Sequence, residues 1–424
     1  MDSRLWPGAR RAFVAALVVF VYTTVVGALN GLDVFTPSHE TLMTHVHSGT
    51  LGWIALGVTG AALLMFGRRG LNEREVATGD RLSWAMIGAI VLTVAAFFTG
   101  DTIWRPIAGT VLFAVTIWFL VWMLRNHRRS GEGSVPRLGL ILSWISLLMG
   151  AFFGVILGIF MSEGEVPGIG DDTALAIAEA HPPAMVIGFL ILAALALSEW
   201  LLRPDAVWTR SGAVQMWLLF AAGILVNIAI LSGLEEELLG PANLLMIVGI
   251  VMLVARCWAQ LRPSGWSTAG TGAYPRVGVL FLVAYLALGT TIMVRVVSGT
   301  MDLDALTEGE EGLLLTFDHT MFVGVMTMLL LGVMASRLRG SRLNAVDRIV
   351  LWGAPVGLVI FAIGLMALED LPKQIGTPIM GGALLAGIGG YLWELSRTRA
   401  EPTTATTADW KAPTVPITTS SPPT

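Results

Sequence analysis

Four of the six histidines in this chain stand at repeated positions in long apolar segments. The segments read "HVHSGTLGWIALGV", "HPPAMVIGFLILAA" and "FDHTMFVGVMTMLL", and each leads to a glycine and an apolar run. The three glycines, Gly52, Gly188 and Gly324, are evenly spaced and give a repeat of about 136 residues. His45 and His181 stand seven residues before their glycine, and His47 and His319 stand five residues before theirs. Neutral imidazole is the commonest metal ligand and a common axial ligand of haem iron, so the pattern predicts ligation.

The alternative for any one of these histidines is a neutral ring that hydrogen-bonds to a neighbouring membrane helix. An ionisable side chain at membrane depth is costly, and four such side chains in one register favour ligation. His45 and His47 are two positions apart, so they point roughly 200° apart on a helix. The sequence therefore predicts two environments, His47 with His319 and His45 with His181. His39 and His127 are predicted to lie at the interface and in a basic loop.

The elements that must hold these histidines are membrane helices. The chain has 424 residues, of which 55% are hydrophobic and 13% are charged, and its mean hydropathy is +0.74. Apolar stretches of roughly 20 residues, the length that crosses a bilayer, recur along the whole sequence. We predict an all-α integral membrane protein with twelve spans: 12–30, 38–66, 82–99, 104–124, 138–161, 172–201, 210–232, 241–260, 277–298, 311–335, 347–367 and 376–396.

The loop charges predict the orientation. The odd-numbered loops are acidic, and only three of the 26 Lys and Arg residues fall on their side of the membrane: Arg105, Arg295 and Lys373. The positive-inside rule then predicts that both termini lie on the cytoplasmic side of the membrane. We expect this membrane to be the plasma membrane. Residues 398–424 are rich in Thr and Pro and are predicted to be a disordered cytoplasmic tail. The single cysteine, Cys257, excludes an intrachain disulfide and a multi-cysteine metal site.

The same spacing divides the transmembrane domain, 1–397, into three repeats. The prolines expected to open the fourth, eighth and twelfth spans, Pro106, Pro241 and Pro378, are also about one repeat apart. We therefore expect three pseudo-equivalent four-helix units, at about 1–125, 126–261 and 262–397.

Twelve spans in three groups, with histidines on the second, sixth and tenth, resemble subunit I of the haem–copper oxidases. In that family the second and tenth spans hold a low-spin haem on two axial histidines, and His47 and His319 match these positions. The tenth-span pattern of the family is His-x-His; here it reads "FDH", with Phe317 in the first place. The family's sixth span has His-Pro, whose histidine binds copper, and His181 in "HPP" matches it.

This chain departs from the family at the active site. Its seventh span, 210–232, lacks the paired copper histidines, and the sixth span lacks the family's tyrosine. The resemblance therefore implies a relative that keeps one haem b, with copper as a further candidate, and that does not reduce oxygen. The chain resembles the NnrS family equally closely, through the segment "HPPAMVIGF". That family consists of twelve-helix haem- and copper-containing proteins and is linked to nitric oxide stress.

Other residues could support a haem. Arg105 and Arg295 are expected to bind its propionates, since arginine binds carboxylates in bidentate fashion, although each could instead pair with a nearby acid. Met185, one turn after His181, is a possible soft ligand for copper(I). The expected partners are haem, the lipid bilayer and a redox protein or quinone, with no nucleic acid.

Two other functions fit the same residues. A twelve-helix secondary transporter would also have both termini inside, with Asp318 and Glu179 as the nearest acids to the histidines, but its usual symmetry is two halves and not three thirds. An oxidase assembly or metal-handling factor would use the same histidines with transient occupancy.

Overall fold

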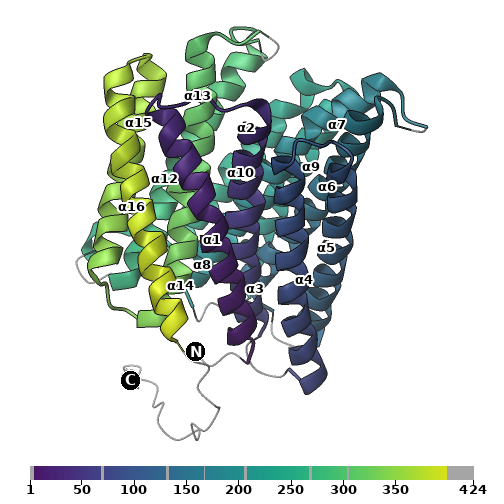
Figure 1. The fold of residues 1–424 in the computed structure, drawn as a ribbon. Coiled ribbons are helices and arrows are strands. Elements are labelled where there is room, and N and C mark those ends of the chain that lie inside the picture. The colour runs from purple at the N-terminus through teal and green to yellow at the C-terminus, as the bar shows by residue number, and fades with distance from the viewer. Residues whose placement is uncertain are drawn as a thin grey trace, which may run out of the picture.

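The computed structural model describes residues 4–67, 71–129, 133–166, 168–204, 208–266, 270–302 and 305–398. These residues form a bundle of helices without strands (Figure 1). Twelve helical stretches within them are long and apolar enough to cross a membrane, and each coincides with one of the predicted spans. The predicted tail at 398–424 lies outside the described residues, apart from Thr398.

The helices follow one another along the chain as α1 (Trp6–Gly31), α2 (His39–His47), η1 (Ser48–Ala55), α3 (Leu56–Phe66), α4 (Glu73–Phe98), α5 (Trp104–Arg129), α6 (Val135–Glu163), α7 (Asp171–Pro183), η2 (Ala184–Leu190), α8 (Ile191–Leu202), α9 (Arg210–Ser232), α10 (Glu235–Arg256), α11 (Trp258–Leu261), η3 (Pro263–Gly265), η4 (Gly270–Gly272), α12 (Ala273–Val297), α13 (Glu308–His319), η5 (Thr320–Thr327), α14 (Met328–Arg339), α15 (Ala345–Ala367) and α16 (Asp370–Arg397).

Several helices extend past the predicted spans, because hydropathy detects only the apolar part of a helix. The helix of the third span, for example, begins well before the predicted start, at Glu73, where the side chain of Asn72 accepts a hydrogen bond from the backbone N–H of Glu75. The expectation that Pro241 and Pro378 open their helices is wrong. Both lie inside helices, which begin at Glu235 and Asp370, and only Pro106 lies in a first turn.

Three spans form the centre of the bundle. In the second, sixth and tenth spans, 78–89% of the most apolar window is buried, against 28–56% in the other nine described spans. The second and tenth spans are joined by a buried hydrogen bond, in which Trp53 Nε1 donates to Thr327 Oγ1 at 2.9 Å. A buried bond between side chains stabilises helix contacts where no water competes, so these spans are held together at mid-depth.

Each central span contains a π-helical segment. The segments begin at Ser48, Ala184 and Thr320, which are spaced at the same interval as the three landmark glycines. In each span the α-helix that carries the histidines, α2, α7 or α13, leads directly into the π segment. A π segment inserts one residue into the helical repeat and is frequent at functional sites.

The outer helices close a ring around this centre. Each span contacts the next along the chain, and α16 contacts α1. Helices α13, α15, α16, α1 and α2 thus lie in succession, as do α2, α4, α5, α6 and α7, and α7, α9, α10, α12 and α13. We name these the first, second and third groups. In Figure 1, α2, α7 and α13 lie at the end of the bundle away from the N-terminus.

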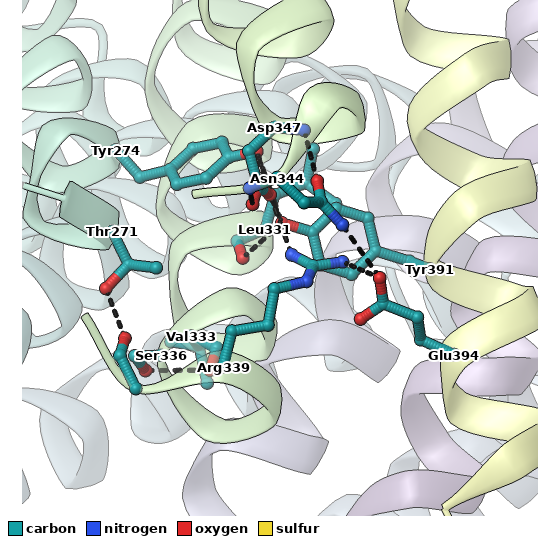
Figure 2. Close-up of polar contacts among 11 residues, drawn as sticks. Thr271, Tyr274, Leu331, Val333, Ser336, Arg339, Asn344, Asp347, Tyr391 and Glu394 are labelled. Atoms are coloured by element: carbon teal, nitrogen blue, oxygen red, sulfur yellow. Dashed lines mark hydrogen bonds and ion pairs between the residues drawn. The ribbon is translucent and has the colours of Figure 1, made fainter. Parts of the chain in front are cut away.

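The opposite end contains a buried polar network, drawn in Figure 2. Asp347 is fully buried and accepts hydrogen bonds from Tyr391 Oη (2.6 Å), Tyr274 Oη (3.0 Å) and Arg339 Nη1 (2.8 Å). Arg339 also pairs with Glu394 at 2.6 Å. These contacts connect α12, α14, α15 and α16, so the network ties the ends of four helices together.

Candidate functional site

The three side chains seven residues before the landmark glycines lie against glycines of the preceding span. A Cβ atom placed on Gly27 of α1 would lie 3.0 Å from Cε1 of His45, and one on Gly154 of α6 would lie 3.1 Å from Cε1 of His181. In the tenth span a Cβ atom on Gly289 of α12 would lie 3.0 Å from the ring of Phe317. Glycine at each position leaves room for the ring.

The two histidines five residues before the glycines face the following span. The ring of His47 stacks on Phe97 of α4, with centroids 3.7 Å apart and 16° between the planes. The ring of His319 lies 5.2 Å from that of Phe361 on α15. The two histidines of the second span therefore face different groups of helices, as expected for residues two positions apart on a helix.

Backbone carbonyl groups orient three of the four rings. His47 Nδ1 donates to Met43 O at 2.8 Å, His319 Nδ1 to Leu315 O at 2.7 Å, and His181 Nδ1 to Gly150 O at 2.9 Å. A proton on Nδ1 leaves the Nε2 lone pair for a ligand, as in many metal-bound histidines. His45 interacts with the Thr23 backbone, and its buried Nδ1 has no hydrogen-bond partner in the described structure.

The four histidines face the groups of helices in two pairs. His45 and His319 face the first group, through Gly27 of α1 and Phe361 of α15, and His47 and His181 face the second group, through Phe97 of α4 and Gly154 of α6. This pairing differs from that expected from the sequence, in which His47 is matched with His319. The physical reason is that the residue seven positions before the glycine faces the preceding span and the residue five positions before it faces the following span. Ligation by either pair stays a prediction.

The third group of helices has aromatic side chains where the other two have histidines. Phe317 stacks on Tyr285 of α12, with centroids 4.1 Å apart and 17° between the planes. The hydroxyl of Tyr285 is buried, has no hydrogen-bond partner among the described residues and interacts electrostatically with Asp318. Two of the three groups thus have a histidine pair, and the third is packed with rings.

The basic residues predicted to bind propionates differ in their surroundings. Arg105 lies over the ring of Phe97, with Cζ 5.0 Å from the centroid, and its buried Nε has no hydrogen-bond partner in the described part of the chain. It interacts electrostatically with His47. Arg295 pairs with Glu310 at 2.6 Å, which is the alternative expected for it. Lys373 of α16 pairs with Asp33 and with Asp370, each at 3.0 Å.

The sequence did not identify the residues on neighbouring helices that contact the histidine rings. Gly27 and Gly154 occupy equivalent places in two groups of helices, as do Phe97 and Phe361, but neither pair keeps the spacing of the landmark glycines. These residues lie on neighbouring helices, so the repeat that identified the histidines did not identify them. Among the described residues, no group of three or more His, Cys, Asp or Glu side chains is arranged as a metal site.

No protein-family model matches this sequence, and no curated protein sequence matches it.

Proposed function

We propose that this chain is a haem-binding membrane protein related to subunit I of the haem–copper oxidases and to the NnrS family. It holds a low-spin haem b between α2 and α13 and acts in electron transfer or in the handling of nitric oxide or metals. The observation that carries the proposal is that His45 and His319, on two central buried spans, both face the first group of helices. We prefer His45 to His47 as the partner of His319 because His47 faces α4, in the second group.

The surroundings of this pair fit a haem. His319 keeps Nε2 free because its Nδ1 donates to Leu315 O, and His45 has a buried ring nitrogen without a hydrogen-bond partner in the described structure. An unpaired buried polar atom is costly, so a ligand that uses it regains that free energy. Gly27 leaves room for the His45 ring, which fixes the ring's position against α1. Two imidazoles complete the coordination of an iron whose other four ligands come from the porphyrin.

The same features argue against oxygen reduction. A haem with two histidine ligands has no open coordination position, and its chemistry is the transfer of one electron. At the place where the oxidase family has its high-spin haem ligand, Phe317 stacks on Tyr285. The electron would come from a quinone or a redox protein, and copper is a further candidate ligand for the remaining histidines.

We also infer three pseudo-equivalent four-helix units, with both termini on the cytoplasmic side of the plasma membrane. The three π segments support the repeat, since their first residues keep the spacing of the landmark glycines. The helix caps Asn72 and Asn344 support it as well, because they are two repeats apart and each accepts a hydrogen bond from the backbone three residues on.

The test is the optical spectrum of the purified full-length protein, made in haem-replete cells. We expect a low-spin b-type band in the reduced-minus-oxidised spectrum and a positive pyridine haemochrome assay. His45→Ala and His319→Ala should each remove the same low-spin component, whereas the exposed His39→Ala should leave it unchanged. A featureless spectrum from haem-replete protein would exclude this function and would leave a transporter as the better explanation.

A further inference from the structure

The second group of helices contains a histidine pair of its own. His47 of α2 stacks on Phe97 of α4 and His181 of α7 lies against Gly154 of α6, so both face the second group, and neither belongs to the His45–His319 pair. Both side chains lie in α-helices that lead directly into a π segment, as His319 does. The two pairs thus share the second span, on different faces of it, and take their other histidine from the tenth or the sixth span.

Both rings of this second pair are oriented for ligation. The Nδ1 atoms of His47 and His181 donate to the carbonyl groups of Met43 and Gly150, so both Nε2 atoms keep their lone pairs. The ring of His47 is also fixed by its stacking on Phe97. The bond from His181 joins α7 to α6, and the Nε2 of each ring is left for a ligand.

A row of glycines on α6 lets the neighbouring helices approach this pair. Gly150, Gly154 and Gly158 are four residues apart and therefore lie on one face of the helix. Gly154 leaves room for the His181 ring, and a Cβ atom on Gly158 would lie 3.1 Å from the backbone N of Pro106. The glycines thus bring α7 and the beginning of α5 close to the same face of α6.

Charge distinguishes between two kinds of ligand for this pair. Arg105, next to Pro106, lies over the Phe97 ring on which His47 stacks, and its Nε is buried without a hydrogen-bond partner in the described structure. A fixed positive charge beside the site repels a bare metal cation. It attracts the carboxylates of a haem, which arginine binds well. The arrangement favours an iron porphyrin over a copper ion.

We propose that the chain binds a second haem between α2 and α7, with His47 and His181 as axial ligands and Arg105 as the cation for its carboxylates. This site rests on the proposed haem function but uses none of the residues of the first site, so either site can fail without the other. The third group, with Phe317 and Tyr285, has no equivalent histidine pair among its described residues.

The experiment is a measurement of haem per chain, by pyridine haemochrome against quantitative amino-acid analysis. We expect about two haems in the wild-type protein and about one in His47→Ala, His181→Ala, His45→Ala and His319→Ala. The first two variants should keep one spectral component and the last two should keep the other. The double variant His45→Ala/His47→Ala should hold none, and His39→Ala should hold both.

Two further measurements guard against a variant that simply misfolds. His181→Gly leaves a space that free imidazole can fill, and added imidazole should restore the second haem. Arg105→Gln should lower the midpoint potential of the second component alone, because a nearby positive charge favours the reduced iron.

The outcomes separate the two proposals. One haem per chain that survives His47→Ala and His181→Ala would overturn the second site and keep the first. One haem that survives His45→Ala and is lost in His47→Ala would support the second site and overturn the first. The second haem would also be overturned if the wild-type protein bound one copper ion per chain, lost it in His181→Ala and held no haem on His47.

Discussion

Asp347 at one end of the bundle accepts hydrogen bonds from two tyrosines and an arginine, whereas His45 at the other end has a buried nitrogen with no partner in the described structure. Both are polar groups inside an apolar bundle, where an unpaired charge or dipole is costly. Around Asp347 the protein itself meets that cost, as Figure 2 shows. Around the histidines it leaves one nitrogen of each ring available. The difference favours a stabilising role for the Asp347 network and supports the proposal that the histidine end binds a ligand.

The largest effect should come from breaking the Asp347 network. Asp347→Ala leaves Arg339 without the more deeply buried of its two carboxylate partners, and the arginine side chain is only 10% exposed. Removing one partner of a buried ion pair costs about 3–5 kcal/mol, so the unfolding temperature in detergent should fall sharply. Glu394→Gln is the matched control, because Glu394 is 29% exposed and its loss should cost much less. Equal effects of the two variants would contradict this role.

Packing between α15 and α16 should have the next largest effect. A Cβ atom on Gly357 would lie 2.4 Å from the backbone N of Met380, so Gly357→Ala must push the two helices apart. Overpacking of this kind costs about 1–3 kcal/mol, and it also moves Tyr391 away from Asp347. Gly382→Ala on α16 meets no atom within 4 Å and should be silent in thermal unfolding. A silent Gly357→Ala would mean that the helices separate freely.

The histidine end should respond differently. In haem-free protein, His45→Ala removes a ring with an unpaired nitrogen, and the relief offsets the lost packing on Gly27. We expect a change of under about 1 kcal/mol in the free energy of unfolding. Thermal unfolding of the haem-free variant and of haem-free wild-type protein gives the comparison. A loss as large as that of Asp347→Ala would make the histidines structural and would remove the contrast between the two ends.

The smallest effect concerns an exposed ion pair near the histidines. The hydrogen bond from Lys373 lowers the pKa of Asp33 below its ordinary value. Because the folded-state pKa is the lower one, the pair stabilises the fold above the ordinary carboxyl pKa, and this is lost as the pH falls through the folded-state value. Unfolding temperatures of wild-type protein and Lys373→Met should therefore differ slightly at neutral pH and converge in acid. A constant difference at all pH values would rule out the Asp33 contribution.

Much of the architecture was predictable because a bilayer imposes a simple rule on composition. All twelve predicted spans coincide with helices, because a segment of roughly 20 apolar residues has the length and composition of a membrane-crossing helix. Helix ends were less predictable, because charged first turns such as that at Glu235 lie beyond the apolar part. The Ser38 cap was predictable from residue type alone, and its side chain does accept a bond from Thr41.

The histidine pairs could be predicted only in part. The repeat identified the four side chains, and helical geometry showed that His45 and His47 point apart. Helical geometry did not show whether His45 or His47 faces His319. That depends on the side of the second span against which the tenth span packs. The glycines that contact the rings, Gly27 and Gly154, lie on other helices and do not keep the spacing of the landmark glycines. Long-range packing decides both, and no local pattern carries that information.

The π segments set the rotation of the histidine-bearing part of each central span relative to the helix that follows it. Each inserts one residue between the histidine-bearing turn and the buried helix that follows it. Deleting one residue there would turn everything before the segment by about 100° relative to everything after it. The histidines would then face new neighbours without any change to themselves. A chain of this design can therefore change the surroundings of its histidines by insertion and deletion, while the membrane-spanning framework stays in place.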